Sequence, residues 1–145
     1  METWPCGPHL LELEPPDIFH CHVRGPVEEE HAKETMRVYN EEIRAKRGIR
    51  IFFISHLEES GDSSFTSAAR RYIEKTKVDW KAVIVVGGSP LMQLASTIVA
   101  LAAAMLSDNP MPTVMVKSMD EARKYIAEAR AKEAAKAPSS ANASR

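Results

Sequence analysis

The chain has few cysteines, almost no net charge and no apolar run long enough for a membrane span. Two cysteines, Cys6 and Cys21, in 145 residues are too few for a disulfide framework. The 19 basic and 20 acidic residues give a net charge of −1, which leaves no basic surface for DNA, RNA or anionic lipid. We therefore expect no nucleic acid among the partners.

The one candidate for a membrane span, Leu91 to Leu106, falls short of the roughly 20 apolar residues that cross a bilayer. It is also interrupted by Gln93, Ser96 and Thr97. The N-terminus has neither the basic patch nor the apolar core of a signal peptide. These absences predict a cytoplasmic protein without a membrane span.

The clearest positive signal is the stretch from Ala82 to Pro90. Five consecutive apolar residues, Ala82–Val86, are typical of a parallel strand that is buried on both faces. Gly87 and Gly88 permit a sharp turn, Ser89 can cap a helix, and Pro90 suits its first position. The sequence therefore predicts a central strand followed directly by a helix.

The remaining patterns predict strands and helices that alternate along the chain. Strands are expected at residues 9–14, 17–24, 49–54, 82–86 and 113–116, and helices at 27–47, from 62–64 to about 77, at 89–107 and from 118. Such alternation indicates an α/β domain with a mixed, mostly parallel five-stranded sheet and about four helices. We assign residues 9–131 to this domain, 1–8 to a flexible arm and 132–145 to a disordered tail.

Three phrases carry a resemblance to a known family. They are Asp17-Ile-Phe-His-Cys-His-Val-Arg-Gly-Pro26, Ala82-Val-Ile-Val-Val-Gly87 and Asp120-Glu-Ala-Arg123. In these phrases and in the order of its elements, the chain resembles the STAS domain, in particular the SpoIIAA-like branch of anti-sigma-factor antagonists. The resemblance covers roughly Leu10 to Ala129 and implies a STAS-like fold.

The resemblance also implies a function. Antagonists of this type carry an Asp-Ser-Ser-Gly motif at a helix start, which corresponds to Asp62, Ser63, Ser64 and Phe65, with Phe65 in place of the glycine. It implies a non-enzymatic regulatory domain with Ser64 or Ser63 as phosphoacceptor. Its protein partner would be an anti-sigma factor or a kinase-like protein. The partner-binding loop would contain Ser55, Asp62, Phe65 and Ser67, where Ser55 replaces the usual Asp.

Two of these features have structural alternatives. Asp62 to Ser64 could simply cap a helix. The uncharged helix could be deeply packed, or could present its smaller residues, Gln93, Ser96, Thr97 and Ala100, to an apolar ligand or to a second copy in a homodimer. The ligand alternative corresponds to a carrier of the CRAL-TRIO type, a related STAS-like group.

Other candidate sites have weak signals. His20 and His22 share one strand face and could hold a metal with His9 or His56, but a pair on one strand is usually a surface feature, so we expect no metal. Gly87-Gly88-Ser89 lacks the spacing of a nucleotide loop, which favours a plain turn over an anion site. Cys21 and His22 point to opposite faces. We therefore expect no catalytic residues and no cofactor.

Overall fold

The structure, a computed structural model, describes residues 1–57, 65–105 and 111–143. For residues 92, 96, 99, 100, 103 and 137–143 it describes the backbone alone. The strands are β1 (Glu2–Cys6), β2 (His9–Glu14), β3 (Ile18–His22), β4 (Phe52–His56), β5 (Ala82–Val86) and β6 (Thr113–Val116). The helices are α1 (Glu29–Arg37), the π-helical segment η1 (Val38–Arg44), α2 (Ala45–Arg47), α3 (Ser67–Lys75), α4 (Pro90–Ala104) and α5 (Met119–Ala143).

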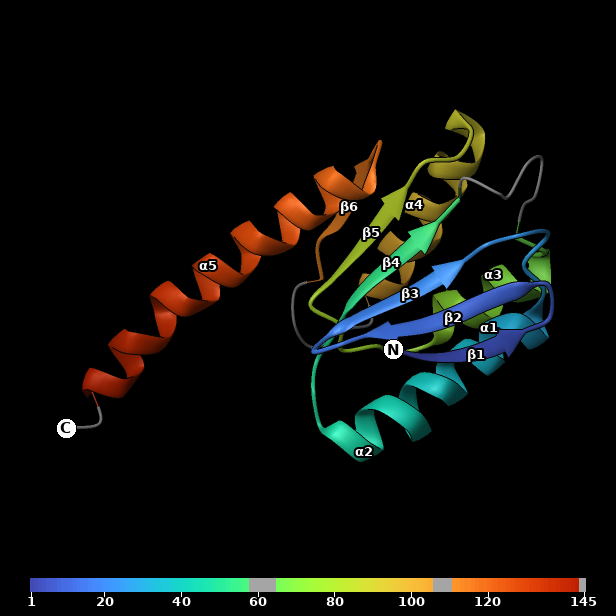
Figure 1. The fold of residues 1–145 in the computed structure, drawn as a ribbon. Helices are drawn as coiled ribbons and strands as arrows, with labels where there is room; N and C mark the ends of the chain where they lie inside the picture. The colour runs from blue at the N-terminus through green and yellow to red at the C-terminus, as the bar shows by residue number, and fades with distance from the viewer. Residues whose placement is uncertain (58–64, 106–110, 144–145) are drawn as a thin grey trace.

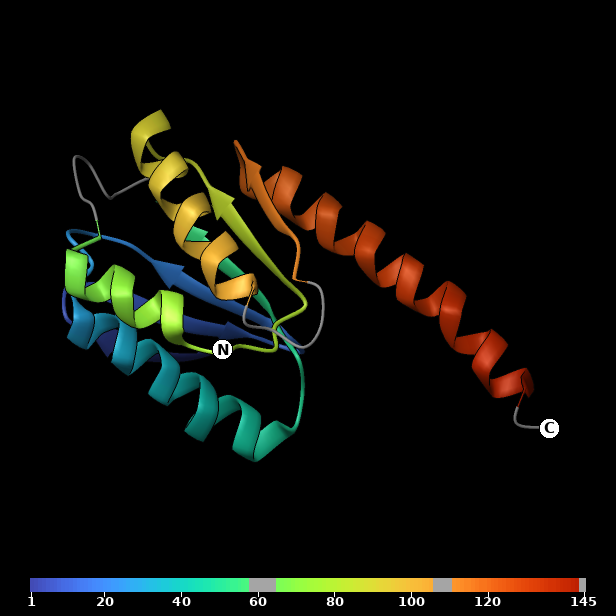
Figure 2. The ribbon, with the colours of Figure 1, turned by 180° about the vertical axis from the view of Figure 1, so that it is seen from behind.

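The six strands form one sheet in chain order (Figure 1). β1, β2 and β3 are antiparallel neighbours, whereas β3, β4, β5 and β6 run parallel. The connections between the parallel strands are right-handed, and each leads to the next strand in the same direction across the sheet. They place α1, α3 and α4 on one face, and α5 lies on the other (Figure 2). The predicted α/β class is confirmed, with six strands where five were predicted.

The sixth strand comes from the N-terminus, where we predicted a flexible arm. β1 pairs with β2 from Glu2 opposite Leu13 to Cys6 opposite His9, and Cys6 is buried in the core. Proline is tolerated at Pro5 because β1 is an edge strand. Gly7 forms the tight turn at a φ of 59°, which favours glycine. Residues 2–6 therefore belong to the folded domain.

The sheet separates two apolar clusters. Alternate side chains such as Leu11, Phe19 and Val85 pack toward the layer of α1, α3 and α4. Their neighbours Ile18 and Ile84 pack toward α5. All five residues of β5 are buried, as the unbroken apolar run predicts.

The start of α3 differs from the prediction. Thr66 is the N-cap, and its side-chain hydroxyl accepts a hydrogen bond from the Ala69 amide at 3.2 Å. The Thr66 amide in turn donates to the Val27 carbonyl at 3.0 Å. Asp62, Ser63 and Ser64, which we expected to cap this helix, precede its first residue and lie outside the described residues. The cap therefore belongs to the threonine that follows Phe65.

α5 begins as predicted and continues further. Ser118 accepts a hydrogen bond from the Glu121 amide at 3.3 Å, as the Ser-to-Glu spacing predicts. Ala122 and Ile126 are buried against the sheet. The helix then extends to Ala143, beyond the sheet, where we predicted a disordered tail from residue 132 (Figure 1). Glu133 accepts a hydrogen bond from Lys81, the residue before β5, so contacts between α5 and the domain extend past residue 131.

Candidate functional site

Ser55, Phe65 and Ser67 are the residues of the expected partner-binding loop that the structure describes. Ser55 lies inside β4 and is buried, so it cannot belong to an exposed loop. Phe65 is half-buried and forms a bridge with Val27, while Ser67 is exposed at the start of α3. The expected phosphoacceptors Ser63 and Ser64 fall outside the described residues together with Asp62. Of the expected loop residues that are described, Ser67 is therefore exposed and Ser55 is not.

On α4, the face expected to be exposed is partly buried. Gln93 donates a hydrogen bond from Nε2 to the Gly87 carbonyl at 2.7 Å, and Thr97 donates to the Gln93 carbonyl at 2.8 Å. Ala104 packs against the core between the sheet and the helical layer. For Ser96 and Ala100, the other residues of the expected face, only the backbone is described. Of the described side chains on this face, Gln93 and Ala104 thus contact the rest of the domain.

Four large apolar side chains of α4, and that of Met105 directly after the helix, are exposed. Their exposed fractions are 77% for Leu91, 56% for Leu94, 45% for Ile98, 52% for Leu101 and 86% for Met105. Their spacing of three, four, three and four residues places them on one stripe, which we call the α4 stripe. A contiguous apolar stripe without charge is unusual on the free surface of a soluble protein and is typical of an interaction surface.

No helix among the described residues combines the length and the apolar composition needed to cross a bilayer. α4 has 15 residues and is about 22 Å long at 1.5 Å per residue.

A second feature is an apolar cavity of about 120 Å³ between the sheet and the helices α1 and α3. Val83 and Val85 of β5 line one side, and Met36 of α1 and Tyr72 of α3 line the other. Trp80, which precedes β5, completes the wall and stacks on Phe53 at a ring distance of 4.5 Å. The cavity therefore lies within the main core rather than beside α4.

The polar groups of the cavity wall are almost all satisfied. The hydroxyls of Thr35 and Thr76 donate to backbone carbonyls of their own helices at 2.9 and 2.6 Å. The exception is Trp80 Nε1, a buried donor without a hydrogen-bond partner in the described part of the chain. An apolar molecule would fit this cavity, and one acceptor atom on it could pair with the indole N–H.

A third feature is a cluster of three histidines on the face of the sheet that carries α5. His20 and His22 come from β3, and His56 is the last residue of β4, directly opposite His22 in the parallel pair. His20 Nδ1 lies 2.8 Å from His56 Nε2, and the rings of His22 and His56 are 4.4 Å apart. Strand alternation in the sequence predicts that His20 and His22 share a face. The pairing of β4 with β3 places His56 on the same face beside them.

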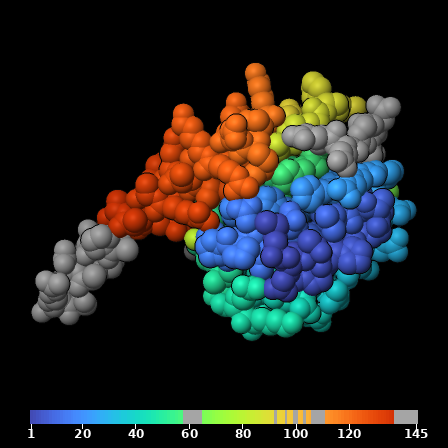
Figure 3. All heavy atoms as spheres, in the orientation of Figure 1, coloured from blue at the N-terminus to red at the C-terminus, as the bar shows by residue number. Residues whose placement is uncertain are grey.

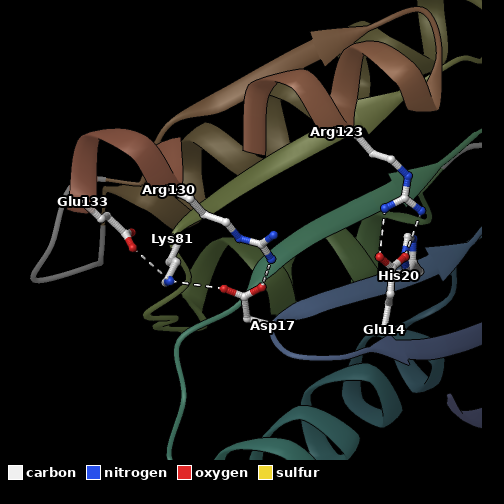
Figure 4. Close-up of polar contacts among 7 residues, drawn as sticks. All are labelled: Glu14, Asp17, His20, Lys81, Arg123, Arg130 and Glu133. Atoms are coloured by element: carbon white, nitrogen blue, oxygen red, sulfur yellow. Dashed lines mark hydrogen bonds and ion pairs between the residues drawn. The ribbon is translucent and has the colours of Figure 1, made fainter. Parts of the chain in front are cut away.

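Two carboxylates of β2 hold the histidines of β3. Glu14 Oε1 is 3.0 Å from His20 Nε2, and Glu12 Oε1 is 3.3 Å from His22 Nε2. Arg123 of α5 forms a bidentate ion pair with Glu14, with N–O distances of 2.8 and 3.0 Å (Figure 4). This ion pair joins α5 to the same edge of the cluster.

Charges and burial set the protonation states here. The hydrogen bonds from Arg123 lower the pKa of Glu14 to about 2. Burial lowers the pKa of His20, and burial together with the charges of His22 and His20 lowers the pKa of His56 to about 3. His20 and His56 are therefore neutral imidazoles at neutral pH.

α5 covers only part of this face. In Figure 3 the strands β1 to β3 remain visible beside the orange and red helix. At the other end of α5, Arg130 pairs with Asp17, and Lys81 bridges Asp17 and Glu133 at 3.2 Å each (Figure 4). The helix is thus attached to the sheet at both ends of their contact.

Comparison with protein-family models, with curated proteins and with solved structures gives no match for this chain.

Proposed function

We propose that this protein is a non-enzymatic interaction domain of STAS-like type and that it docks through the α4 stripe rather than through the loop around Ser64. The observation that carries this proposal is the α4 stripe itself, in which four large apolar side chains of α4 and that of Met105 directly after it are exposed, while Gln93 bonds to the Gly87 carbonyl. Exposed apolar surface costs free energy unless another surface covers it. The expectation of a protein-binding domain is retained, with its surface relocated.

The partner we commit to is a second copy of this chain. Residues spaced alternately three and four apart are the repeat by which two helices pack side by side, so the stripe is complementary to itself under twofold symmetry. It carries no charge that would repel its own copy. Covering ten such side chains would remove on the order of 1,000 Å² of surface, close to the lower limit for a specific interface. We therefore expect a reversible homodimer.

Sedimentation equilibrium across a concentration series tests the dimer. The mass of the wild type is expected to rise from that of one chain to that of two within the micromolar range. A charge at the centre of the stripe, as in Ile98→Glu, would be desolvated in the dimer, so this variant is expected to stay monomeric. Its melting temperature is expected to equal that of the wild type at protein concentrations where the wild type is also monomeric.

Ala127→Glu, the same kind of change on the exposed face of α5, is the matched control and is expected to dimerise like the wild type. A wild type that is monomeric at every concentration contradicts the proposal. So does an Ile98→Glu variant that dimerises as the wild type does.

The cavity supports a second candidate function, a carrier or sensor of a small apolar molecule. An engineered protein cavity of about 150 Å³ holds benzene, so 120 Å³ limits the ligand to a similarly small molecule or to one segment of a larger one. Contact with Trp80 provides a reporter, since Trp4→Phe would leave it as the single tryptophan.

For this candidate, native mass spectrometry of the purified protein is expected to show a retained apolar ligand, and toluene is expected to change Trp80 fluorescence in the Trp4→Phe protein. Ala32→Leu, which adds volume to the cavity wall, is expected to abolish the response. Ala129→Leu, on the opposite side of the sheet, is the control. An identical toluene response in Ala32→Leu and the control would rule out the cavity as the binding site.

A further inference from the structure

We propose that His20, His22 and His56 form a binding site for a divalent transition-metal ion of the Zn²⁺ type. This inference is independent of the proposed docking function and reverses our expectation, from the sequence, of a chain without a metal. One ligand atom from each of the three imidazoles lies within 4.8 Å of the other two. Three histidine ligands with one open position are a recurrent protein site for zinc.

The sheet itself brings the three side chains together. Side chains two residues apart on a strand share a face, which aligns His20 with His22. The parallel register places His56 of β4 directly opposite His22. Because all three positions lie on paired strands, their Cα atoms are held by backbone hydrogen bonds. A site on strands is more precisely positioned than one on loops.

Hydrogen bonding selects the ligand atoms. The Nε2 atoms of His20 and His22 face Glu14 and Glu12, which leaves their Nδ1 atoms for the metal. His20 Nδ1 already lies 2.8 Å from His56 Nε2, the third ligand atom. Two nitrogens on one tetrahedral zinc are about 3.3 Å apart. Metal binding would therefore replace this hydrogen bond: the ring proton of His56 would move from Nε2 to Nδ1, and the two nitrogens would separate by about half an ångström as the stacked rings rotate.

Glu12 and Glu14 provide the outer shell that metal-bound histidines usually have. A carboxylate that accepts the second ring N–H fixes the tautomer and orientation of the imidazole and makes it a better ligand. Both β3 histidines have such a partner on β2. The two carboxylates also place negative charge next to a divalent cation, while Arg123 is neutralised by both oxygens of Glu14.

The donor set determines the class of ion. Imidazole nitrogen favours Zn²⁺, Cu²⁺, Ni²⁺ and Co²⁺, whereas Mg²⁺ and Ca²⁺ prefer oxygen ligands. The side chains of His22 and Glu12 are 28% and 24% exposed, so the ion can enter from solvent without unfolding of the sheet. The fourth coordination position would hold water or an anion.

A second group of close donor atoms, in Glu28, Glu30 and His31, serves as an internal control. Its two glutamates are exposed, and His31 Nδ1 already accepts a hydrogen bond from the Glu28 amide at 3.1 Å. This histidine therefore caps α1 and is not free to bind a metal through Nδ1. Any weak binding by exposed carboxylates would arise here.

The test is a titration of full-length protein, without an affinity tag, with Zn²⁺ by calorimetry and with Co²⁺ by visible absorption. The wild type is expected to bind one Zn²⁺ and to give the intense visible bands of four- or five-coordinate Co²⁺ bound to nitrogen. Thiolate charge-transfer bands are expected to be absent because Cys21 faces the other side of the sheet.

His22→Gln and His56→Gln are each expected to abolish the Co²⁺ bands and weaken Zn²⁺ binding by more than 100-fold. Glu12→Gln, which keeps all three ligands, is expected to weaken binding by about 10- to 100-fold, as loss of an outer-shell partner does. Glu30→Gln is the control and is expected to bind like the wild type. Thermal melts of the metal-free variants verify that each is folded.

The proposal is overturned if the wild type binds no more Zn²⁺ than the folded His22→Gln and His56→Gln variants. It is also overturned if Glu30→Gln removes the binding, which would move the ion to the exposed carboxylates. Dimerisation through the α4 stripe and ligand uptake by the cavity would be unaffected by either result, so failure here is distinguishable from failure of the proposed function.

Discussion

His9 is a buried histidine whose surroundings require the neutral form. Its Nδ1 accepts a hydrogen bond from the Arg24 amide at 3.0 Å, so no proton can occupy that nitrogen without loss of the bond. Nε2 lies 3.2 Å from the Pro26 carbonyl and 3.3 Å from His31 Nδ1. Burial is the main cause of the lowered pKa of His9, and the neighbouring His31 adds to it, opposed by the Pro26 carbonyl and Glu28.

This environment predicts that acid destabilises the protein in part through His9. In the unfolded chain the pKa of this residue is near the ordinary histidine value of 6.5, whereas the folded state takes up the proton only at lower pH. Between these two pKa values, stability falls as the pH falls, by up to about 1.4 kcal/mol per pH unit for one histidine. Urea unfolding at pH 7.5, 6.0 and 5.0 measures the decline.

His9→Gln removes the titrating group and keeps a hydrogen-bonding side chain. We expect its stability at pH 7.5 to be lower than that of the wild type, and its decline between pH 6.0 and 5.0 to be shallower. The pKa values of His20 and His56 are lowered as well, so some decline will remain in the variant. Parallel curves for the two proteins would contradict the assignment of His9 as a buried neutral base.

At the scale of single elements, β3 and β4 show what the sequence could and could not predict. The alternation in β3 correctly places His20 and His22 on one face. His56 was expected in a loop because polar residues follow Ile54. In the structure β4 runs to His56, which pairs with His22 of β3 on one side and Val86 of β5 on the other. Register is a property of paired strands, so the third histidine could be assigned only from the sheet.

α4 shows a different limit. The absence of charge correctly predicted a helix with an unusual surface. The expected interaction face, however, was selected because its side chains are small. Small residues permit close packing on the sheet, which turns Gln93 and Thr97 inward and leaves the α4 stripe exposed. The three-and-four spacing of the stripe was present in the sequence. It was hidden because almost every position of this helix is apolar.

β1 was missed because of two prolines, Pro5 within the strand and Pro8 in the turn that follows it. Trp4 and Cys6 alternate with more polar residues, the pattern of a half-buried strand. Proline is unfavourable inside a sheet, but Pro5 lies on an edge strand, opposite Leu10. Whether a strand lies at the edge of a sheet depends on the order of all the strands. The sequence of the five-residue segment that forms β1 cannot show this.

At the scale of the whole molecule, the order of elements was largely predictable because each parallel strand is followed by an amphipathic or apolar helix. The STAS-like assignment and the phosphoacceptor role of Ser63 or Ser64 stay predictions. The cavity was not predictable from sequence, since it depends on how side chains from α1, α3 and three strands fill the space between them.

The same reasoning about long-range contacts leads to a prediction for α5. Its first half supplies Ala122 and Ile126 to the cluster formed with Ile18 and Ile84, and its polar contacts to the sheet end at Glu133. Residues 134–136 are exposed. The helix is therefore expected to act as the cover of one sheet face up to Glu133, with no stabilising role for the residues that follow.

Two truncations, compared by urea unfolding, separate these halves of α5. Removal of residues 134–145 is expected to change the free energy of unfolding by no more than about 0.5 kcal/mol, as surface changes do. Removal of residues 119–145 exposes buried apolar side chains of β3, β4 and β5 and is expected to cost several kcal/mol, a large part of the stability of a small domain.

Aggregation of the protein that lacks residues 119–145 would agree with that loss. A cooperative unfolding transition at the wild-type urea midpoint would show that α5 does not cover the sheet in solution, because no other described helix lies on that face.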